Sequence, residues 1–164
     1  MKYQPVWHSL LLLFAIFLTF LWVNDEILAN YSLQLTAFLL LAVLLIRHLH
    51  RSSAYKLAES TVSTISVLLI TSATGGLSSP LFFLNHLLLF ELSFLLEPSI
   101  PITLSIGLMV FYLYSHQVGG SPTQLLILFS FPVMTPLAYF FGKLYLKEEN
   151  QKKEIRNLSQ KLIY

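Results

Sequence analysis

The chain has 164 residues, of which 55% are hydrophobic and only 11% charged, and its net charge is +2. A soluble domain usually carries about a quarter charged residues, and one of this size could not bury so much apolar surface in a single core. Lipid is therefore the expected solvent for much of the surface. The sequence has no basic patch with interleaved aromatic residues, which excludes nucleic acid as a partner, and the absence of Cys excludes disulfides and thiol chemistry.

Long hydrophobic segments separated by short polar breaks predict an all-α integral membrane six-helix bundle over residues 1–142. A spanning helix needs about 20 residues, and several of the segments are at or below this length. The fourth and fifth segments could instead form a re-entrant hairpin that is buried in protein. The six expected helices are 6–23, 27–46, 57–74, 80–96, 99–115 and 123–142.

The distribution of Lys and Arg predicts that both ends of the chain are cytoplasmic. With the N-terminus inside, all ten cations fall on the inner side, while Asp25 and Glu26 fall in an outer loop. We therefore expect a multi-pass protein of the plasma or bacterial inner membrane. The inner cations are Lys2, Arg47, Arg51, Lys56, Lys143, Lys147, Lys152, Lys153, Arg156 and Lys161.

The C-terminal segment 143–164 is charged, lacks Gly and Pro, and is rich in helix formers. It predicts a cytoplasmic helical linker that continues the sixth span, with a solvated tail as the alternative. Ile155, Leu158 and Leu162 have the a-d-a spacing of a coiled coil, although the matching upstream positions are polar.

The fourth segment places polar residues among Leu and Phe. Pro80 suits a first helical turn and Ser78 or Ser79 can cap it, so Glu91 should lie about 16 Å deeper, near the middle of the bilayer. A carboxylate there usually faces the bundle interior or a water-filled cavity. His86 and Glu91 are separated by about 140° around the helix and do not share a face. On one interpretation, His86 and Glu91 anchor a lipophilic ligand or form a proton site. On the other, they are interhelical hydrogen-bonding groups.

The third segment carries a stripe of small hydroxyl residues on one helical face. Such residues allow close helix packing, so the stripe is interpreted as a packing surface on which Glu91 could find a partner. Its members are Ser60, Thr64, Thr71 and Thr74.

The segment 74–82, with the sequence T-G-G-L-S-S-P-L-F, resembles the outer loop of RegB/PrrB-type redox-sensor histidine kinases. That family has six membrane helices and a G-G-x-x-N-P-F heptapeptide, associated with ubiquinone binding, between the third and fourth. Gly75, Gly76 and Pro80 match this heptapeptide. Ser79 stands where the family has Asn, and the aromatic residue comes one step later, at Phe82.

The resemblance implies a sensor domain that binds a quinone or another lipophilic ligand near this loop. The family's redox Cys is absent, and no phosphoacceptor His or ATP-binding sequence follows. We therefore expect a sensor-like membrane module, either alone or as part of a longer sensor, without enzymatic activity of its own. The expected ligand-binding residues are Gly75, Gly76, Ser79, Pro80, Phe82, His86 and Glu91.

The predicted function is signal input: the membrane bundle signals to a cytoplasmic partner through the C-terminal helix. The protein is expected to be a homodimer in the bilayer. The alternative is a small transporter or channel subunit in which Glu91 is a proton or cation site. A membrane enzyme is disfavoured because the standard catalytic and metal-binding signatures are missing, so no catalytic or metal-ligating residue is assigned.

Overall fold

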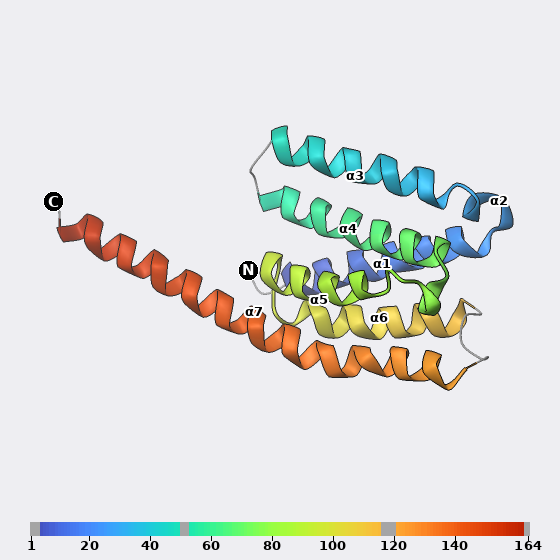
Figure 1. Ribbon diagram of the computed structural model, residues 1–164. Helices are drawn as coiled ribbons and strands as arrows, with labels where there is room; N and C mark the ends of the chain where they lie inside the picture. The colour runs from blue at the N-terminus through green and yellow to red at the C-terminus, as the bar shows by residue number, and fades with distance from the viewer. Residues whose placement is uncertain (1–3, 50–52, 116–120, 163–164) are drawn as a thin grey trace.

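The computed structural model describes residues 4–49, 53–115 and 121–162, and all regular structure in these ranges is helical. Six long helices cover the six hydrophobic segments, which confirms the all-α prediction (Figure 1). The elements are α1 Gln4–Asn24, α2 Glu26–Ala29, α3 Ser32–Leu49, α4 Ser53–Ala73, the 3-10 turn η1 Gly76–Ser78, α5 Phe83–Leu95, α6 Ile100–Tyr114 and α7 Pro122–Leu162.

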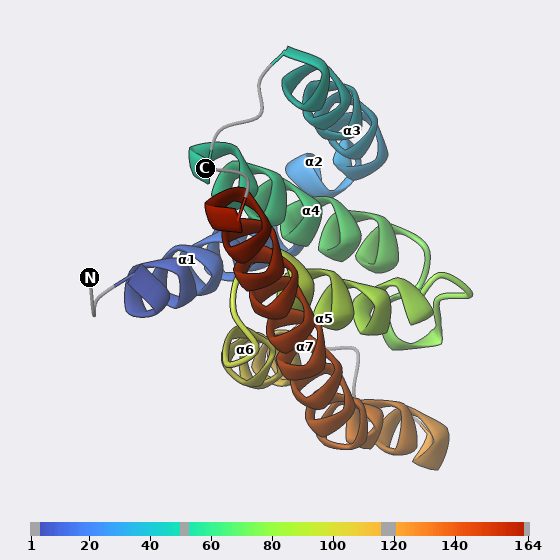
Figure 2. The same ribbon diagram turned by 90° about the vertical axis from the view of Figure 1, so that its left-hand side faces the viewer.

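The long helices form one bundle in which α5 is central. Helix α5 contacts α4, α6 and α7, while α1 contacts both α4 and α6. Helix α3 packs on α4 at one edge of the bundle (Figure 2). The first half of α7 lies along α5 and α6, and its second half projects from the bundle (Figure 1).

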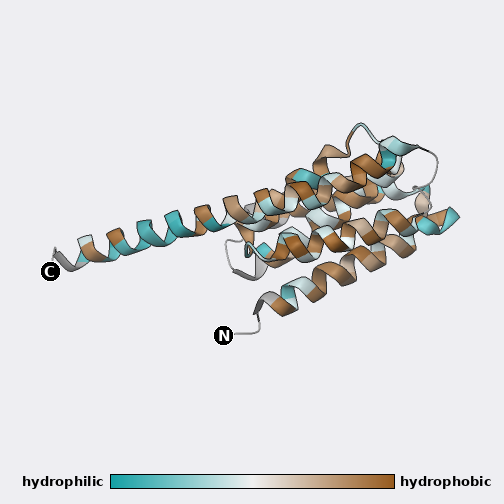
Figure 3. Cartoon of the chain, turned by 90° about the horizontal axis from the view of Figure 1, so that it is seen from below, coloured by the Kyte–Doolittle hydropathy of each residue, from teal (hydrophilic) through white to brown (hydrophobic). Residues whose placement is uncertain are grey.

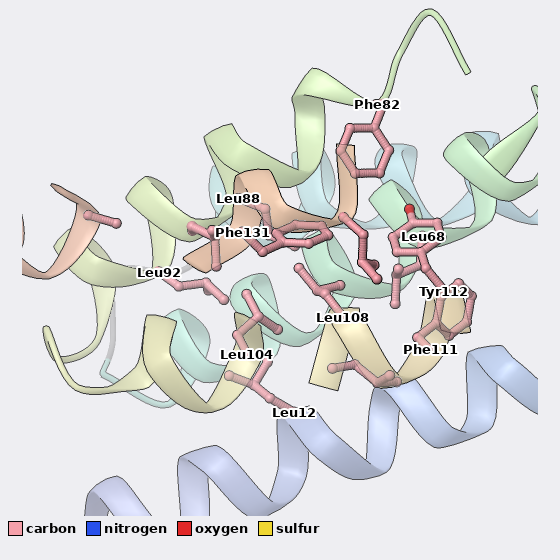
Figure 4. Packing of buried hydrophobic residues seen from close by; sticks show 14 of the residues in the cluster. Leu12, Leu68, Phe82, Leu88, Leu92, Leu104, Leu108, Phe111, Tyr112 and Phe131 are labelled. Carbon is pink, nitrogen blue, oxygen red and sulfur yellow. The ribbon is translucent and has the colours of Figure 1, made fainter. Parts of the chain in front are cut away.

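Leucine and aromatic side chains from five helices meet in the core around α5 (Figure 4). Leu89 and Leu92 are completely buried, as is Phe131 of α7. Helix α5 is therefore buried where it faces α4, α6 and α7, whereas Phe83, Leu87 and Phe94 are exposed on its remaining face. The other large side chains of the core are Leu68, Leu77, Leu88, Ile100, Leu104, Leu108, Phe111 and Tyr112.

Cationic positions gather at one end of the bundle. The start of α1, the end of α3, the start of α4 and the projecting half of α7 all lie at that end (Figure 1). Lys56 and Lys143 belong to it, whereas Asp25 and Glu26 lie between α1 and α3 at the opposite end. Lys2 and Arg51, which entered the sequence argument, lie outside the described residues.

The second predicted helix, 27–46, is wrong at its start. The chain there forms the short helix α2 and turns before α3 begins at Ser32. The turn falls at Asn30 and Tyr31, after α2, where the Asn30 side-chain amide donates to the Glu26 carbonyl at 3.0 Å. The Asp25 Oδ1 accepts hydrogen bonds from the Ile27 and Leu28 N–H groups, each at 3.0 Å, and so caps the start of α2.

The fourth predicted helix, 80–96, is also wrong at its start, because α5 begins only at Phe83. The preceding residues form i→i+3 turns, with the Phe82 N–H donating to the Ser79 carbonyl at 3.1 Å. The Ser79 hydroxyl oxygen accepts from the Leu81 N–H at 3.0 Å, so Ser79 caps this turn and not the helix. Pro80 is therefore not in a first helical turn, and α5 with 13 residues is only about 20 Å long.

The sixth predicted helix and the C-terminal linker form a single helix of 41 residues, α7. Pro132 and Pro136 lie inside it. Each proline lacks an N–H, so the carbonyls of Leu128 and Pro132 lose their helical donors. Helix α7 changes direction along its length, and the projecting half follows the prolines in sequence (Figure 1).

Most residues of the bundle helices are hydrophobic (Figure 3), and many of their large apolar side chains are exposed. Trp7 on α1 and Leu126 on α7 are each 70% exposed. Among the described helices, Val6–Asn24 and Pro122–Gln160 are long and apolar enough to cross a membrane, whereas the apolar stretches of α3, α5 and α6 are shorter. Two candidate spans are thus present where the sequence predicted six.

Candidate functional site

The Tyr112 hydroxyl joins three helices near the end of the bundle opposite the projecting tail. It lies 2.8 Å from the Thr71 Oγ1 of α4 and donates to the Asn85 Oδ1 of α5 at 3.3 Å. All three side chains are completely buried. The Asn85 amide also donates to the Phe82 carbonyl at 3.1 Å, and Thr71 can bond the Val67 carbonyl at 2.7 Å. The polar groups are therefore mutually satisfied, as buried groups must be.

Aromatic rings cover this network. The Phe82 ring lies 5.4 to 5.5 Å from the rings of Tyr112, His86 and Phe131, measured between centroids. The His86 ring also packs on Phe131 at 5.5 Å, and its Nε2 lies 2.7 Å from the Ser130 Oγ. We call Phe82, His86, Tyr112 and Phe131 the aromatic cluster. It brings α5, α6 and α7 together beside the loop that precedes α5.

The loop closes over the cluster because its glycines adopt left-handed backbone conformations. Gly75 has φ 118° and Gly76 has φ 59°, which residues with a Cβ rarely adopt. The turn directs Leu77 into the core, where it is 1% exposed. At the loop's other end, the hydroxyls of Thr74 and Ser79 lie 2.5 Å apart. The loop is thus packed onto the bundle.

The structure brings together only part of the predicted ligand site. Phe82 and His86 are in the aromatic cluster, and Ser79 is buried beside it in the loop. Gly76 is buried too, whereas Gly75 and Pro80 are exposed. These residues form a continuous region at one end of the bundle, from which the seventh predicted residue, Glu91, is separate.

Glu91 lies deeper along α5 and faces α4. The Ser63 hydroxyl donates to its Oε1 at 3.3 Å. This confirms that Glu91 and His86 use different faces of α5, since His86 contacts α7. The partner comes from another helix, as expected, but Ser63 is not on the predicted hydroxyl stripe. On that stripe, Ser60 and Thr64 each bond a carbonyl of their own helix, which supports its interpretation as a packing surface. Thr71 and Thr74 also bond hydroxyls outside α4.

Sequence analysis missed Tyr112, Ser130 and Phe131 as members of this region. Tyr112 sits inside an apolar run, where its hydroxyl was the only available signal. Ser130 looks like an ordinary small residue until the fold places it opposite His86. The site offers hydroxyls, an amide and one imidazole, which suit hydrogen bonding to a polar head group. In the described ranges, no group of three potential metal-ligating residues comes together.

The chain matches no protein-family model, and no curated protein or solved structure shows significant similarity to it. The functional argument therefore depends on the geometry of the site and of α7.

Proposed function

We propose that this chain is a multi-pass membrane signal-input module, in which the bundle binds a lipophilic ligand and α7 carries the signal to the cytoplasm. One observation carries the proposal: α7 is a single helix that is packed in the bundle over its first half and exposed over its second. A continuous helix moves as one body, so a displacement inside the bundle reaches the tail.

Placement in a bilayer is supported by the exposed surface. Large apolar side chains are exposed on α1, α3, α6 and α7, an arrangement that water disfavours and lipid favours. The cationic positions at one end support a cytoplasmic location for that end, and we propose that the start of α1 and the projecting half of α7 both lie on the cytoplasmic side. The shorter helices α5 and α6 would cross with the help of their flanking turns, and the six-span topology is part of the proposal.

Side chains of α5 contact α7 at two positions along its length. His86 contacts Ser130, and the Ser93 hydroxyl donates to the Ala138 carbonyl at 2.6 Å. Pro132 and Pro136 lie between these two attachments, in the part of α7 with the fewest backbone hydrogen bonds. A change at His86 would therefore alter the course of α7 beyond the prolines.

The ligand we propose is an isoprenoid quinone, or a molecule with a similar polar head and apolar tail. The resemblance of the loop 74–82 supports this choice. The aromatic cluster contains one imidazole and one hydroxyl, which would exchange their present partners, Ser130 and Thr71, for a carbonyl oxygen of the ligand. Binding shifts α7 only if the ligand has different affinities for two packings of the cluster.

The proposed partners are a second copy of the chain and a cytoplasmic signalling protein. Ile155 and Leu158 support this, because they are 66% and 55% exposed on an otherwise polar helix. A parallel pair of tails could cover these side chains, and their a-d spacing fits such a pairing.

The test measures quinone binding and tail movement in the full chain in lipid nanodiscs. Because the sequence has no Cys, single cysteines introduced at exposed Leu33 and Asn157 allow a spin-label distance to be measured. We expect quinone to change this distance, and His86→Ala to weaken binding and abolish the change. Ser99→Ala, at an exposed position in the α5–α6 turn, is the matched control. Absence of binding for every isoprenoid quinone tried would refute the ligand, and binding without movement would refute the signalling role.

A transporter or channel subunit is the second candidate, because the half-buried Glu91 carboxylate lies between α5 and α4 against Ser63. Proton or cation flux into proteoliposomes that disappears in Glu91→Gln would favour this function over signal input. Glu91→Ala that weakens quinone binding, while the protein still inserts into membranes, would favour signal input.

A further inference from the structure

One face of α7, from Tyr139 to Glu154, is turned away from the bundle. The bundle-facing side is marked by buried Ala138 and Gly142 and by Tyr145, whose ring lies 5.3 Å from that of Phe94. Residues spaced at i, i+4, i+8 and i+11 fall on the opposite side. The side chains there border a shallow, open depression of about 740 Å³ on the surface of α7, which we call the groove. Among the described side chains, those that border it are Tyr139, Phe140, Lys143, Leu144, Leu146, Lys147, Asn150, Gln151 and Glu154.

The chemistry of the groove changes in order along the helix axis. Exposed Phe140 and Leu144 provide an apolar wall at the end nearer the bundle. Lys143 lies between them along the axis, and Lys147 follows Leu144, about 6 Å beyond Lys143. Asn150 and Gln151 then provide amides one turn further out. This order runs from the hydrocarbon region through the interface to the aqueous phase.

Lys143 and Lys147 are the cations of this stretch with charge available to a ligand. Lys152 and Lys153, by contrast, are engaged by Glu148 and Glu149, each at 2.7 Å. Neither Lys143 nor Lys147 is in an ion pair within the part of the chain that the structure describes. The single carboxylate of the groove, Glu154, lies about 10 Å beyond Lys147 along the axis, too far to neutralise it.

We propose that this groove binds an anionic phospholipid of the cytoplasmic leaflet. Its acyl chain lies on Phe140 and Leu144, its phosphate is held between Lys143 and Lys147, and its head group reaches the amides of Asn150 and Gln151. The proposal rests on the membrane placement proposed above and adds a binding site to it. Phosphate beside two ammonium groups at a membrane interface is strongly favoured over a zwitterionic head group, which carries no net charge.

The wall of the groove selects a lipid over a soluble anion. A free phosphate would gain only the two lysine contacts, which water and salt weaken at an exposed site. A phospholipid adds the apolar contacts of its chain, and each buried methylene contributes about 0.8 kcal/mol. The bound lipid would hold α7 at the point where it leaves the bundle, close to the start of the signalling segment.

Thermal unfolding of the purified full chain in mixed micelles tests the proposal, with phosphatidylglycerol compared against phosphatidylcholine. A specific lipid that binds only the folded chain should raise Tm by about 4 °C at saturation, and phosphatidylcholine should not. Lys143→Gln with Lys147→Gln should remove the selective rise. Lys143→Arg with Lys147→Arg should keep it, which guards against a loss caused by misfolding. The matched control is Lys152→Gln with Lys153→Gln, which should also keep it.

Several outcomes would overturn the proposal. The first is an equal Tm shift for the two lipids in the unmodified chain. The second is loss of the selective Tm rise in Lys152→Gln with Lys153→Gln, to the same extent as in Lys143→Gln with Lys147→Gln. The third is the same Tm shift with soluble glycerol phosphate alone. A change of oligomeric state in Lys143→Gln with Lys147→Gln, without loss of lipid selectivity, would assign the face to a second copy of the chain. If protein recovered from membranes shows no selective Tm rise with phosphatidylglycerol, the lipid site is refuted but the proposed signal input is not. The two proposals can therefore be refuted separately.

Discussion

The Ser93 side chain of α5 occupies the space that a Cβ atom on Gly142 of α7 would need. The Ser93 hydroxyl in turn donates to the Ala138 carbonyl, one turn before Gly142. Ala138 and Gly142 are both buried, so two small residues four apart allow α7 to approach α5 closely. The path of the proposed signalling helix is therefore set by this contact as well as by the prolines.

We predict that Gly142→Ala destabilises the bundle by about 1–3 kcal/mol, because the added methyl forces α5 and α7 apart. Thermal or chemical unfolding of the purified protein in micelles measures the change. Ser93→Gly should relieve part of the strain, so the double variant should be more stable than the sum of the two single effects predicts. Simple additivity would show that the two positions are not in contact.

The Tyr112 hydroxyl should contribute to stability as well as to the site. We predict that Tyr112→Phe lowers the free energy of unfolding by about 1–2 kcal/mol, because Thr71 and Asn85 lose a buried partner. Tyr114→Phe is the matched control, since Tyr114 is 68% exposed on the same helix and should change stability by less than about 0.5 kcal/mol. Equal effects of the two substitutions would contradict the importance of the buried network.

The sequence predicted the number and order of the long helices, because hydrophobic length is a local property that each segment carries by itself. It misjudged the starts of two helices, near Asn30 and at Ser79, where side chains form hydrogen bonds with the backbone. Such bonds compete with apolar periodicity and leave little trace in it.

The candidate site was predicted only in part for a related reason. His86 and Glu91 attracted attention because polar groups are rare in apolar helices, and their separate faces followed from helix geometry. Their partners Ser130 and Ser63 come from other helices, 44 and 28 residues away in sequence. Serine is common in such helices, so these pairings depend on tertiary packing that no local pattern contains.

The helical content of the projecting tail should depend weakly on pH. The pKa of Glu148 is lowered because its carboxylate accepts a hydrogen bond from Lys152 and is attracted to its charge, and Lys153 lowers the pKa of Glu149 in the same way. A lowered folded-state pKa means that the pairs stabilise the helix above the ordinary value of 4.5, and that this stabilisation is lost as pH falls through the folded-state pKa.

We therefore predict that helical content measured by far-UV circular dichroism is constant from neutral pH to the carboxyl range and then falls slightly. Both pairs lie at the surface of the tail, so added salt should reduce the effect. Glu148→Gln with Glu149→Gln should abolish the dependence. An acid transition that survives in this variant would have to come from other groups.

Pro136 should determine where the tail points. Pro136→Ala restores the N–H that the Pro132 carbonyl lacks, and we expect it to straighten α7. Asn157 lies 21 residues further on, about 32 Å along the helix, so a change of about 20° in the bend would move it by about 11 Å. The distance between spin labels on cysteines at Leu33 and Asn157 measures this displacement. Val133→Ala, at an exposed position that keeps its backbone N–H, is the control and should leave the distance unchanged. If Pro136→Ala also left it unchanged, the contacts with α5, and not the proline, would set the direction of the tail.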